Sequence, residues 1–341
     1  MDNKNIEKLV SIIIPSRNID YLLELCIKKT RELYKNVQII VVLDDINTQI
    51  QNNNIKILKS DNPNMSAKRN LGVKNTNTKY IAFIDSDDYP NVDWLENGIN
   101  FLEKNDHYFA TTGCQLSPPD DNFEQQCLRS IRYNKLFTHK EWCITNDIET
   151  KEQDCIIFTT ANAIIRKNEY EKLGGMNEEI YLAEDNEFAN RARRNGYKTR
   201  FIPNSSIFHR ECTPLPYFKK SFAACYYYAN NAIKGNLIKP LKETIQQMLP
   251  LFGIIIFFIL WFVFLFLNIS TYPLLILPLF IAILIFKESI NESKKFKTQK
   301  YKATTMIFYF ACIYCLIVLI GTLFGLLNIH LKDIRAHYKH Y

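Results

Sequence analysis

The sequence predicts an α/β domain built on a mostly parallel central sheet, followed by C-terminal transmembrane helices. Short β-branched runs alternate with segments of helical periodicity in the N-terminal part of the chain, which is typical of parallel strands covered by helices. Thr244 to Phe286 contains no charged side chain, and a second uncharged run extends from Ala303 to His330. Acidic residues follow two of the predicted strands, where α/β proteins collect their ligands.

The first predicted strand is the β-branched run at residues 10–14, which Pro15 stops. Residues 21–33 carry apolar side chains at helical spacing and predict a helix. Further strands are expected at residues 37–43, 55–58 and 80–84, with a helix at residues 66–74.

The second half of this domain is less regular. Residues 155–166 indicate a strand pair or a strand and a turn, and residues 186–195 indicate a helix that ends at Gly196, a residue suited to a left-handed cap. Residues 198–202 predict a further strand.

Four regions are expected along the chain. Residues 1–212 form the catalytic domain, 213–247 an amphipathic interfacial linker, 248–330 the membrane region and 331–341 a basic tail. Helical membrane segments are predicted at about residues 249–267, 273–286 and 306–327. The first and third are long enough to span, since a span needs roughly 20 apolar residues, whereas 273–286 is short and fits the returning half of a hairpin. Three full spans would leave the basic tail outside, against the positive-inside tendency, and a re-entrant or interfacial segment is the alternative.

The linker repeats Phe218, Phe222 and Tyr226 every fourth residue beside Lys219 and Lys220. An aromatic face with a basic edge suits a helix at the membrane interface, and a helix packed on the soluble domain fits equally well. The lysines beside the apolar runs are typical of the cytoplasmic side of a membrane and attract anionic lipids.

Composition excludes several classes of protein. The net charge of +7 is moderate, and no basic face interleaved with aromatic residues indicates nucleic-acid binding. Cys312 and Cys315 form the only C-x-x-C, within an apolar run that favours packing over zinc ligation. The N-terminus lacks a hydrophobic signal region, so we expect a catalytic domain in the reducing cytoplasm and a multi-pass protein of the cell membrane.

The acidic segment Asp85-Ser86-Asp87-Asp88 follows a wholly apolar predicted strand. Side chains two residues apart on an extended backbone point the same way, so Asp85 and Asp87 can converge on one cation. Mg²⁺ or Mn²⁺ prefers such oxygen ligands and leaves positions for phosphate oxygens, where it neutralises charge on a departing nucleotide. The alternative is a turn, since Asp is a common turn former.

Lys68 and Arg69 begin a predicted helix, where backbone N–H groups and the helix dipole favour anions. The functional interpretation is contact with the diphosphate or ribose of a donor. A solvated charged face is the alternative, and for Lys68 the two interpretations are evenly balanced.

Asp185 is the candidate general base. A sugar hydroxyl is a poor nucleophile until a positioned carboxylate removes its proton. Acidic residues are also favoured in a first helical turn because of the helix dipole, which could account for Glu184 and Glu187.

Five segments in order resemble glycosyltransferase family 2, the inverting enzymes of GT-A fold, over residues 9 to about 210. These segments are VSIIIPSRN, IIVVLDD, SAKRNLGV, YIAFIDSDDYP and the stretch ANAIIRKNEYEKLGGMNEEIYLAEDNEFANRARRNGYKTRFIP, which contains the E-D motif. The resemblance extends to membrane-anchored bacterial members.

This resemblance implies roles for individual residues. Pro15, Arg17 and Asp45, with Asp44, recognise the nucleotide; Asp87 binds the metal with Asp85 or Asp88 assisting. Asp185 acts as the base. His209 follows a strand where some relatives supply a metal ligand, although a hydrogen-bonded structural histidine fits as well.

Two departures from the family pattern have consequences. Ile46-Asn47 follows Asp44-Asp45 where the family often has Gly-Ser, so the base and ribose pocket differs. The Q-x-x-R-W motif of processive synthases is absent after the E-D motif, which favours transfer of a single sugar.

The sequence thus predicts a metal-dependent inverting glycosyltransferase. The expected donor is a UDP- or GDP-linked sugar, and the expected acceptor is a lipid-linked, plausibly polyprenyl-linked, saccharide or exopolysaccharide precursor. Two alternatives are a nucleotidyltransferase, for which the segment after the first strand lacks the expected glycine-rich loop, and an inactive membrane scaffold, for which the acidic motifs would be expected to decay.

Overall fold

The computed structural model describes most of the chain. The described residues are 3–45, 54–134, 145, 147–156, 158–182, 184–233, 263, 266–267, 276–296 and 298–327. The predicted membrane segment at 249–267 lies outside this set except for residues 263, 266 and 267.

The chain divides into two compact units. Unit 1 consists of Met1–Asp121, Thr138–Arg210 and Arg335–Tyr341, and unit 2 consists of Asn122–Phe137 and Glu211–Ile334. Unit 1 contains the predicted catalytic domain at residues 1–212, except that residues 122–137 and 211–212 belong to the unit that holds the C-terminal helices.

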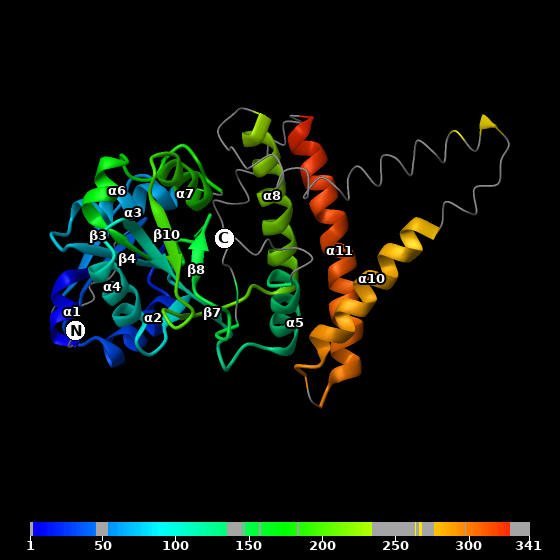
Figure 1. The fold of residues 1–341 in the computed structure, drawn as a ribbon, viewed down its shortest axis with the longest axis horizontal. Coiled ribbons are helices and arrows are strands. Elements are labelled where there is room, and N and C mark those ends of the chain that lie inside the picture. The colour runs from blue at the N-terminus through cyan, green and yellow to red at the C-terminus, as the bar shows by residue number, and fades with distance from the viewer. Residues whose placement is uncertain are drawn as a thin grey trace. The chain divides into compact units, whose positions relative to one another are not determined.

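An eight-stranded mixed sheet forms the centre of unit 1 (Figure 1). Its strand order is β3-β2-β1-β4-β9-β6-β10-β8. The four strands from β3 to β4 are parallel, β10 is parallel to β6, and β9 and β8 are antiparallel to their neighbours. The strands are β1 (Val10–Pro15), β2 (Gln38–Leu43), β3 (Ile55–Lys59), β4 (Tyr80–Ile84), β6 (Tyr108–Thr112), β8 (Gln153–Cys155), β9 (Asn162–Arg166) and β10 (Lys198–Phe201).

A second sheet of three short strands adjoins the acidic segment. Its order is β5-β11-β7, with β5 at Asp88–Pro90, β11 at Ile207–His209 and β7 at Gln115–Leu116. Asp88 and His209 are register partners in this sheet, so the backbone itself brings two of the predicted site residues together.

Helices cover both faces of the central sheet (Figure 1). One apolar cluster joins alternate strand residues such as Ile12 and Ile14 to α2 and α4, and a second joins the intervening Ile13 to α3, α6 and α7. This alternation follows from the two-residue period of a strand. The helices of unit 1 are α1 (Asn3–Leu9), α2 (Tyr21–Leu33), α3 (Met65–Lys74), α4 (Trp94–Lys104), α6 (Lys167–Lys172) and α7 (Glu184–Arg194).

The elements expected in the first half of the domain are confirmed within one or two residues. The Asp20 side chain accepts a hydrogen bond from Leu23 N at 2.9 Å at the start of α2, which is the usual N-cap of a helix. Gly196 has a φ of +83° beyond the end of α7, as expected of a left-handed cap.

In the second half of the domain, the predicted helix at 186–195 and strand at 198–202 are confirmed by α7 and β10 within two residues. A strand pair at residues 155–166 is wrong, because β8 pairs with β10 while β9 lies between β4 and β6. The helices α1, α4 and α5 (Phe123–Arg132) and the strand β6 were not predicted from the sequence.

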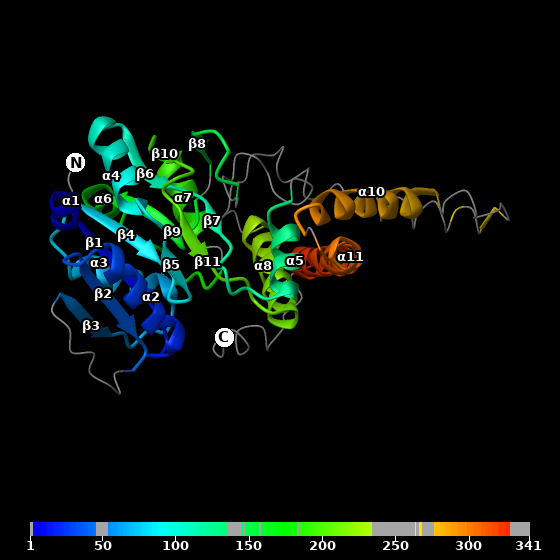
Figure 2. The same cartoon turned by 90° about the horizontal axis from the view of Figure 1, so that it is seen from below.

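Unit 2 is helical. It contains α5, α8 (Pro214–Ile233), α10 (Ile276–Ser293) and α11 (Lys300–Leu326), and Figure 2 shows α5 beside α8 and α11. Its core includes Leu128 and Ile131 of α5 together with Ile307 and Phe310 of α11.

One helix of the described chain is long and apolar enough to cross a membrane. This helix is α11, where Lys300–Gly325 has a mean hydropathy of 2.5, and it contains the segment predicted at 306–327. The segment predicted at 273–286 falls on α10, which also carries Lys287, Glu288 and Glu292 and does not qualify. The described residues therefore support one membrane helix, and the multi-pass prediction is not supported.

The aromatic stripe of the linker faces α11. Phe218 meets Phe310 with ring centroids 5.8 Å apart, Phe222 meets Phe324 at 6.2 Å, and Tyr226 is buried. These rings therefore serve helix packing within unit 2, a partner that neither interpretation of the linker anticipated.

Candidate active site

The acidic segment after β4 forms a tight turn. Asp88 N donates a hydrogen bond to Asp85 O at 3.1 Å, and β5 begins at Asp88. Oxygen atoms of Asp85, Asp87 and Asp88 lie within 4.8 Å of one another. The carboxylates converge as predicted, but a turn brings them together, not an extended backbone.

This cluster fits a hard divalent cation. Three carboxylates offer oxygen ligands, the type that Mg²⁺ and Mn²⁺ prefer, and Asp85 and Asp87 are partly exposed whereas Asp88 is buried. A cation held there would retain coordination positions for phosphate oxygens on the exposed side of the turn.

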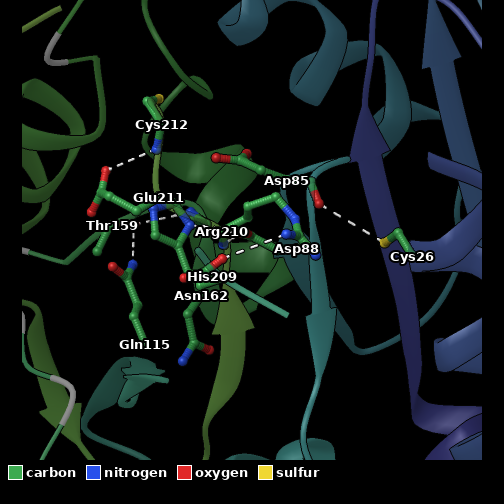
Figure 3. Close-up of polar contacts among 12 residues, drawn as sticks. Cys26, Asp85, Asp88, Gln115, Thr159, Asn162, His209, Arg210, Glu211 and Cys212 are labelled. Carbon is green, nitrogen blue, oxygen red and sulfur yellow. Dashed lines mark hydrogen bonds and ion pairs between the residues drawn. The ribbon is translucent and has the colours of Figure 1, made fainter. Parts of the chain in front are cut away.

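The Asp88 carboxylate forms hydrogen bonds with His209 of β11 and with the next residue, Arg210. His209 Nδ1 lies 2.8 and 2.9 Å from the two Asp88 carboxylate oxygens, and Arg210 N donates to Asp88 Oδ1 at 3.3 Å. Figure 3 shows the His209 ring pointing toward Asp88. His209 is not in the clustered ligand set among the described residues, so the geometry fits the structural alternative, and a ligand role stays a prediction.

Cys26 of α2 lies on the other side of the turn. Its Sγ is 3.8 Å from Asp85 O (Figure 3), and burial, with the charges of Asp88 and Asp87 nearby, raises the pKa of the Cys26 thiol well above its ordinary value. The thiol therefore stays protonated and supports the backbone of the turn.

Arg69 joins the acidic turn after β4 to the Glu184-Asp185 pair at the start of α7. Its guanidinium lies 2.8 Å from Asp85 Oδ1 and 3.0 Å from Glu184 Oε1, and its side chain is 3% exposed. In this structure Arg69 links the acidic turn to the first residue of α7, and its expected contact with the donor stays a prediction.

Lys68 also binds protein groups. Its ammonium lies 2.6 Å from Asp44 Oδ1 and donates to Ser16 O at 2.6 Å, with none of its side chain exposed. Burial lowers the pKa of Lys68, and the Asp44 carboxylate opposes this effect. Lys68 thus holds the carboxyl ends of β1 and β2 together, and its contact with a donor stays a prediction.

Asn70 completes this row of contacts. Its amide donates to Met176 O and Glu178 Oε1, both at 2.9 Å, and accepts from Tyr170 OH at 2.6 Å. Three consecutive residues of α3, Lys68 to Asn70, therefore contact three different parts of the predicted site.

The nucleotide-side residues lie at the ends of β1 and β2. Asp44 N donates to Arg17 O at 3.2 Å, and Pro15 is buried whereas Arg17 and Asp44 are partly exposed. Asp45 is exposed and lies 3.3 Å from Lys59 Nζ. These residues share the sheet edge that also carries the acidic turn, as parallel strands require.

Asp185 follows Glu184 in the first turn of α7, and its Oδ1 accepts from Asn186 N at 2.8 Å. Burial of the carboxylate and the neighbouring negative charge of Glu184 raise the pKa of Asp185 to about 7, while the positive charge of Arg69 lowers it. A carboxyl group with a raised pKa in a polar cluster is typical of a general base.

The mixed sheet, the acidic turn at its carboxyl edge and the second small sheet define the GT-A class of fold. A mannosyltransferase from Pyrobaculum calidifontis, solved with GDP-Man and Mn²⁺, matches the fold with a TM-score of 0.56 and 16% identity over 92% of this chain and 87% of that chain.

Residues 11–174 match the model described as Glycosyl transferase family 2, so this segment of the chain is a glycosyltransferase family 2 domain. The uncharacterised glycosyltransferase EpsJ of Bacillus subtilis is 25% identical over 224 residues, which are 61% of this chain and 64% of the relative. The Escherichia coli protein WfaP, named a UDP-Glc:alpha-D-GlcNAc-diphosphoundecaprenol beta-1,3-glucosyltransferase, is 31% identical over 136 residues, 34% of this chain and 54% of the relative. The chain therefore spans less than two thirds of either relative.

Proposed function

We propose that the chain is a metal-dependent, inverting glycosyltransferase that moves one sugar from a nucleoside diphosphate donor to a hydroxyl group of a lipid-linked saccharide. The observation that carries the proposal is the convergence of the acidic turn, Arg69 and the Glu184-Asp185 pair in one unit. A donor diphosphate and an acceptor hydroxyl need these two kinds of carboxylate close together.

Each side chain has a part in this proposal. Asp85, Asp87 and Asp88 would hold the cation, which when bound supplies positive charge to the donor diphosphate. Pro15, Arg17, Asp44 and Asp45 line the nucleotide side. Lys68 and Arg69 keep these groups in place, because both are buried and bound to carboxylates.

Asp185 acts as the base. Its carboxylate accepts the proton of the acceptor hydroxyl while the hydroxyl oxygen bonds to the anomeric carbon and the bond to the nucleoside diphosphate breaks. Attack from the face opposite the leaving group inverts the configuration at that carbon, and a pKa of about 7 leaves the base partly ionised at neutral pH.

The similarity to WfaP supports the nature of both substrates. That relative is named for a UDP-glucose donor and a diphosphoundecaprenol-linked acceptor; we infer a UDP-sugar donor first, GDP-sugar second, and a polyprenyl-linked acceptor. The apolar helix α11 supports a position at the membrane, and we infer that unit 1 faces the cytoplasm, where nucleotide sugars are made.

A donor panel with two variants tests the proposal. With Mg²⁺ or Mn²⁺ the purified chain should release the nucleotide from one UDP- or GDP-sugar. Asp87→Asn should abolish the cation-dependent part of nucleotide affinity in calorimetry, whereas Asp185→Asn should retain this affinity and lose transfer by about 10²–10⁴-fold.

Two results would contradict the proposal. One is the absence of turnover with every donor and cation; the other is full activity of the Asp185→Asn protein, in purified form or as unchanged glycan in cells. Lys79→Gln, at a surface ion pair with Glu103, is the matched control and should leave both measurements unchanged.

A further inference from the structure

Unit 2 contains an open groove that the proposed chemistry does not use. Its volume is about 560 Å³, within the range of small-molecule sites. The start of α8 and the first turns of α11 line it, together with Glu124 of α5. Met306, Tyr309 and Phe310 supply an apolar and aromatic wall.

The lining of this groove includes one positively charged side chain, Lys302. The Lys302 ammonium is 4.8 Å from the centre of the Phe123 ring. Within the part of the chain that the structure describes, this ammonium makes no ion pair, and the first turn of α11 has no acidic residue. Glu124 is the acidic member of the lining and is exposed.

The polarity of the groove follows the axis of α11. A helix rises about 1.5 Å per residue, so Tyr309 lies roughly 10 Å beyond Lys302. The Lys302 ammonium therefore lies near the N-terminal end of the apolar helix, and the apolar residues that line the groove follow it along α11. A membrane amphiphile has the same order, with its charged head at the interface and its chain inside the bilayer.

We infer that this groove binds a polyprenyl phosphate or diphosphate, with an anionic oxygen on Lys302 and the first apolar units of the chain against Met306 and Tyr309. The inference rests on the proposed function, because the occupant is the carrier of the proposed acceptor. An anionic phospholipid shares this head-and-tail chemistry, and the experiment separates the two sources.

The test is photolabelling of the full chain in lipid nanodiscs. The probes are a polyprenyl phosphate with a diazirine on its first apolar units, the corresponding uncharged polyprenol, and a phosphatidylglycerol with a diazirine in its acyl chain. The labelled residues are mapped by mass spectrometry. Polyprenyl phosphate should label the groove residues, and the other two probes should label them at least about fivefold less.

Variants identify the groups that bind. Lys302→Glu should reduce labelling by polyprenyl phosphate by about tenfold, because a charge-assisted contact becomes a repulsion. Lys300→Glu changes the same charge two residues earlier on α11, on a different side of the helix and outside the lining, and should change labelling less than twofold. Met306→Trp should fill the groove, and Thr305→Trp provides a second filling variant if Met306→Trp fails to fold.

Each outcome bears on a different statement. Equal labelling by phosphatidylglycerol would overturn the polyprenyl assignment, and labelling that survives Lys302→Glu and both Trp variants would overturn the groove. Donor hydrolysis depends on unit 1, so groove variants that keep hydrolysis but lose labelling support the inference. If the chain hydrolyses no donor but its groove variants still lose labelling, the groove assignment is supported and the proposed function is contradicted.

Discussion

At the scale of single residues, Arg69 carries information that its position in the sequence did not reveal. A positive residue at a helix start indicates an anion, and the anions turn out to be the protein's own Asp85 and Glu184. Because the guanidinium is buried and pairs with both carboxylates, removing it would leave uncompensated negative charge, which is costly where it is shielded from water. Arg69 is therefore a positioning residue between the cation cluster and the base.

The raised pKa of Asp185 predicts a pH dependence. A base must be ionised, so kcat/KM measured at saturating cation should fall about tenfold per pH unit below a pKa of about 7 and level off above it. Glu184→Gln removes a negative neighbour and should move this limb to lower pH. Arg69→Gln removes a positive neighbour and should move it to higher pH.

These two shifts have opposite signs, which general loss of structure would not produce. Profiles measured from about pH 5 to about pH 9 for the three proteins are sufficient. A profile that is flat across neutral pH, or shifts of the same sign in both variants, would exclude Asp185 as the titrating base. Far-UV circular dichroism of each variant controls for folding.

At the scale of elements, close helix contacts depend on glycine. A Cβ atom at Gly321 would lie 2.7 Å from Phe222 O, and one at Gly325 would lie 2.4 Å from Tyr226 O. These two positions form a G-x-x-x-G pattern on α11 that lets the backbone of α8 approach, as in membrane helix pairs.

Gly321→Val and Gly325→Val should each destabilise unit 2 by about 1–3 kcal/mol, because backbone carbonyls cannot move aside as a side chain can. Thermal unfolding of the purified chain in detergent micelles measures the effect. Leu316→Val, on a side chain of α11 that is 58% exposed, is the control. Unfolding of both glycine variants at the temperature of the unmodified chain would contradict this helix contact.

At the scale of the whole molecule, the division into units interrupts the catalytic domain. Residues 122–137 leave unit 1 in the middle of its sequence and pack with the C-terminal helices. The buried apolar face of α5 is formed by Cys127, Leu128 and Ile131. Its partners include Ile307 and Phe310, which lie far along the chain.

A chain that ends at Arg210 should therefore be poorly soluble, because it retains α5 without α8 and α11. Exposed apolar faces of this kind promote association. The same fragment with Cys127→Ser, Leu128→Gln and Ile131→Gln should remain soluble and monomeric. Gel filtration of both fragments checks this, and a monodisperse unmodified fragment would show that unit 1 does not depend on unit 2.

Local patterns were sufficient for much of the fold. The strands from β1 to β4 and helices α2 and α3 could be predicted because apolar periodicity and stops such as Pro15 are local signals. The strand β9 could not be placed, because its antiparallel pairing with β4 and β6 joins segments that are far apart in the sequence. The helix α5 has a capping box at Asn122, a local signal that could have revealed it.

The sequence by itself determined the motifs that resemble the family, the carboxylates that gather at the sheet edge and the apolar segment that forms α11. These features could be predicted because short motifs and hydropathy depend only on residues that are neighbours in the sequence. Only the tertiary structure decided which groups of the chain Lys68, Arg69 and His209 contact. Whether a charged side chain contacts a ligand or another part of the same chain depends on segments that are distant in the sequence. The pairs Arg69–Glu184 and Asp88–His209 are separated by 115 and 121 residues. The neighbouring residues in the sequence therefore do not show which charged side chains pair within the protein and which are left to bind a substrate.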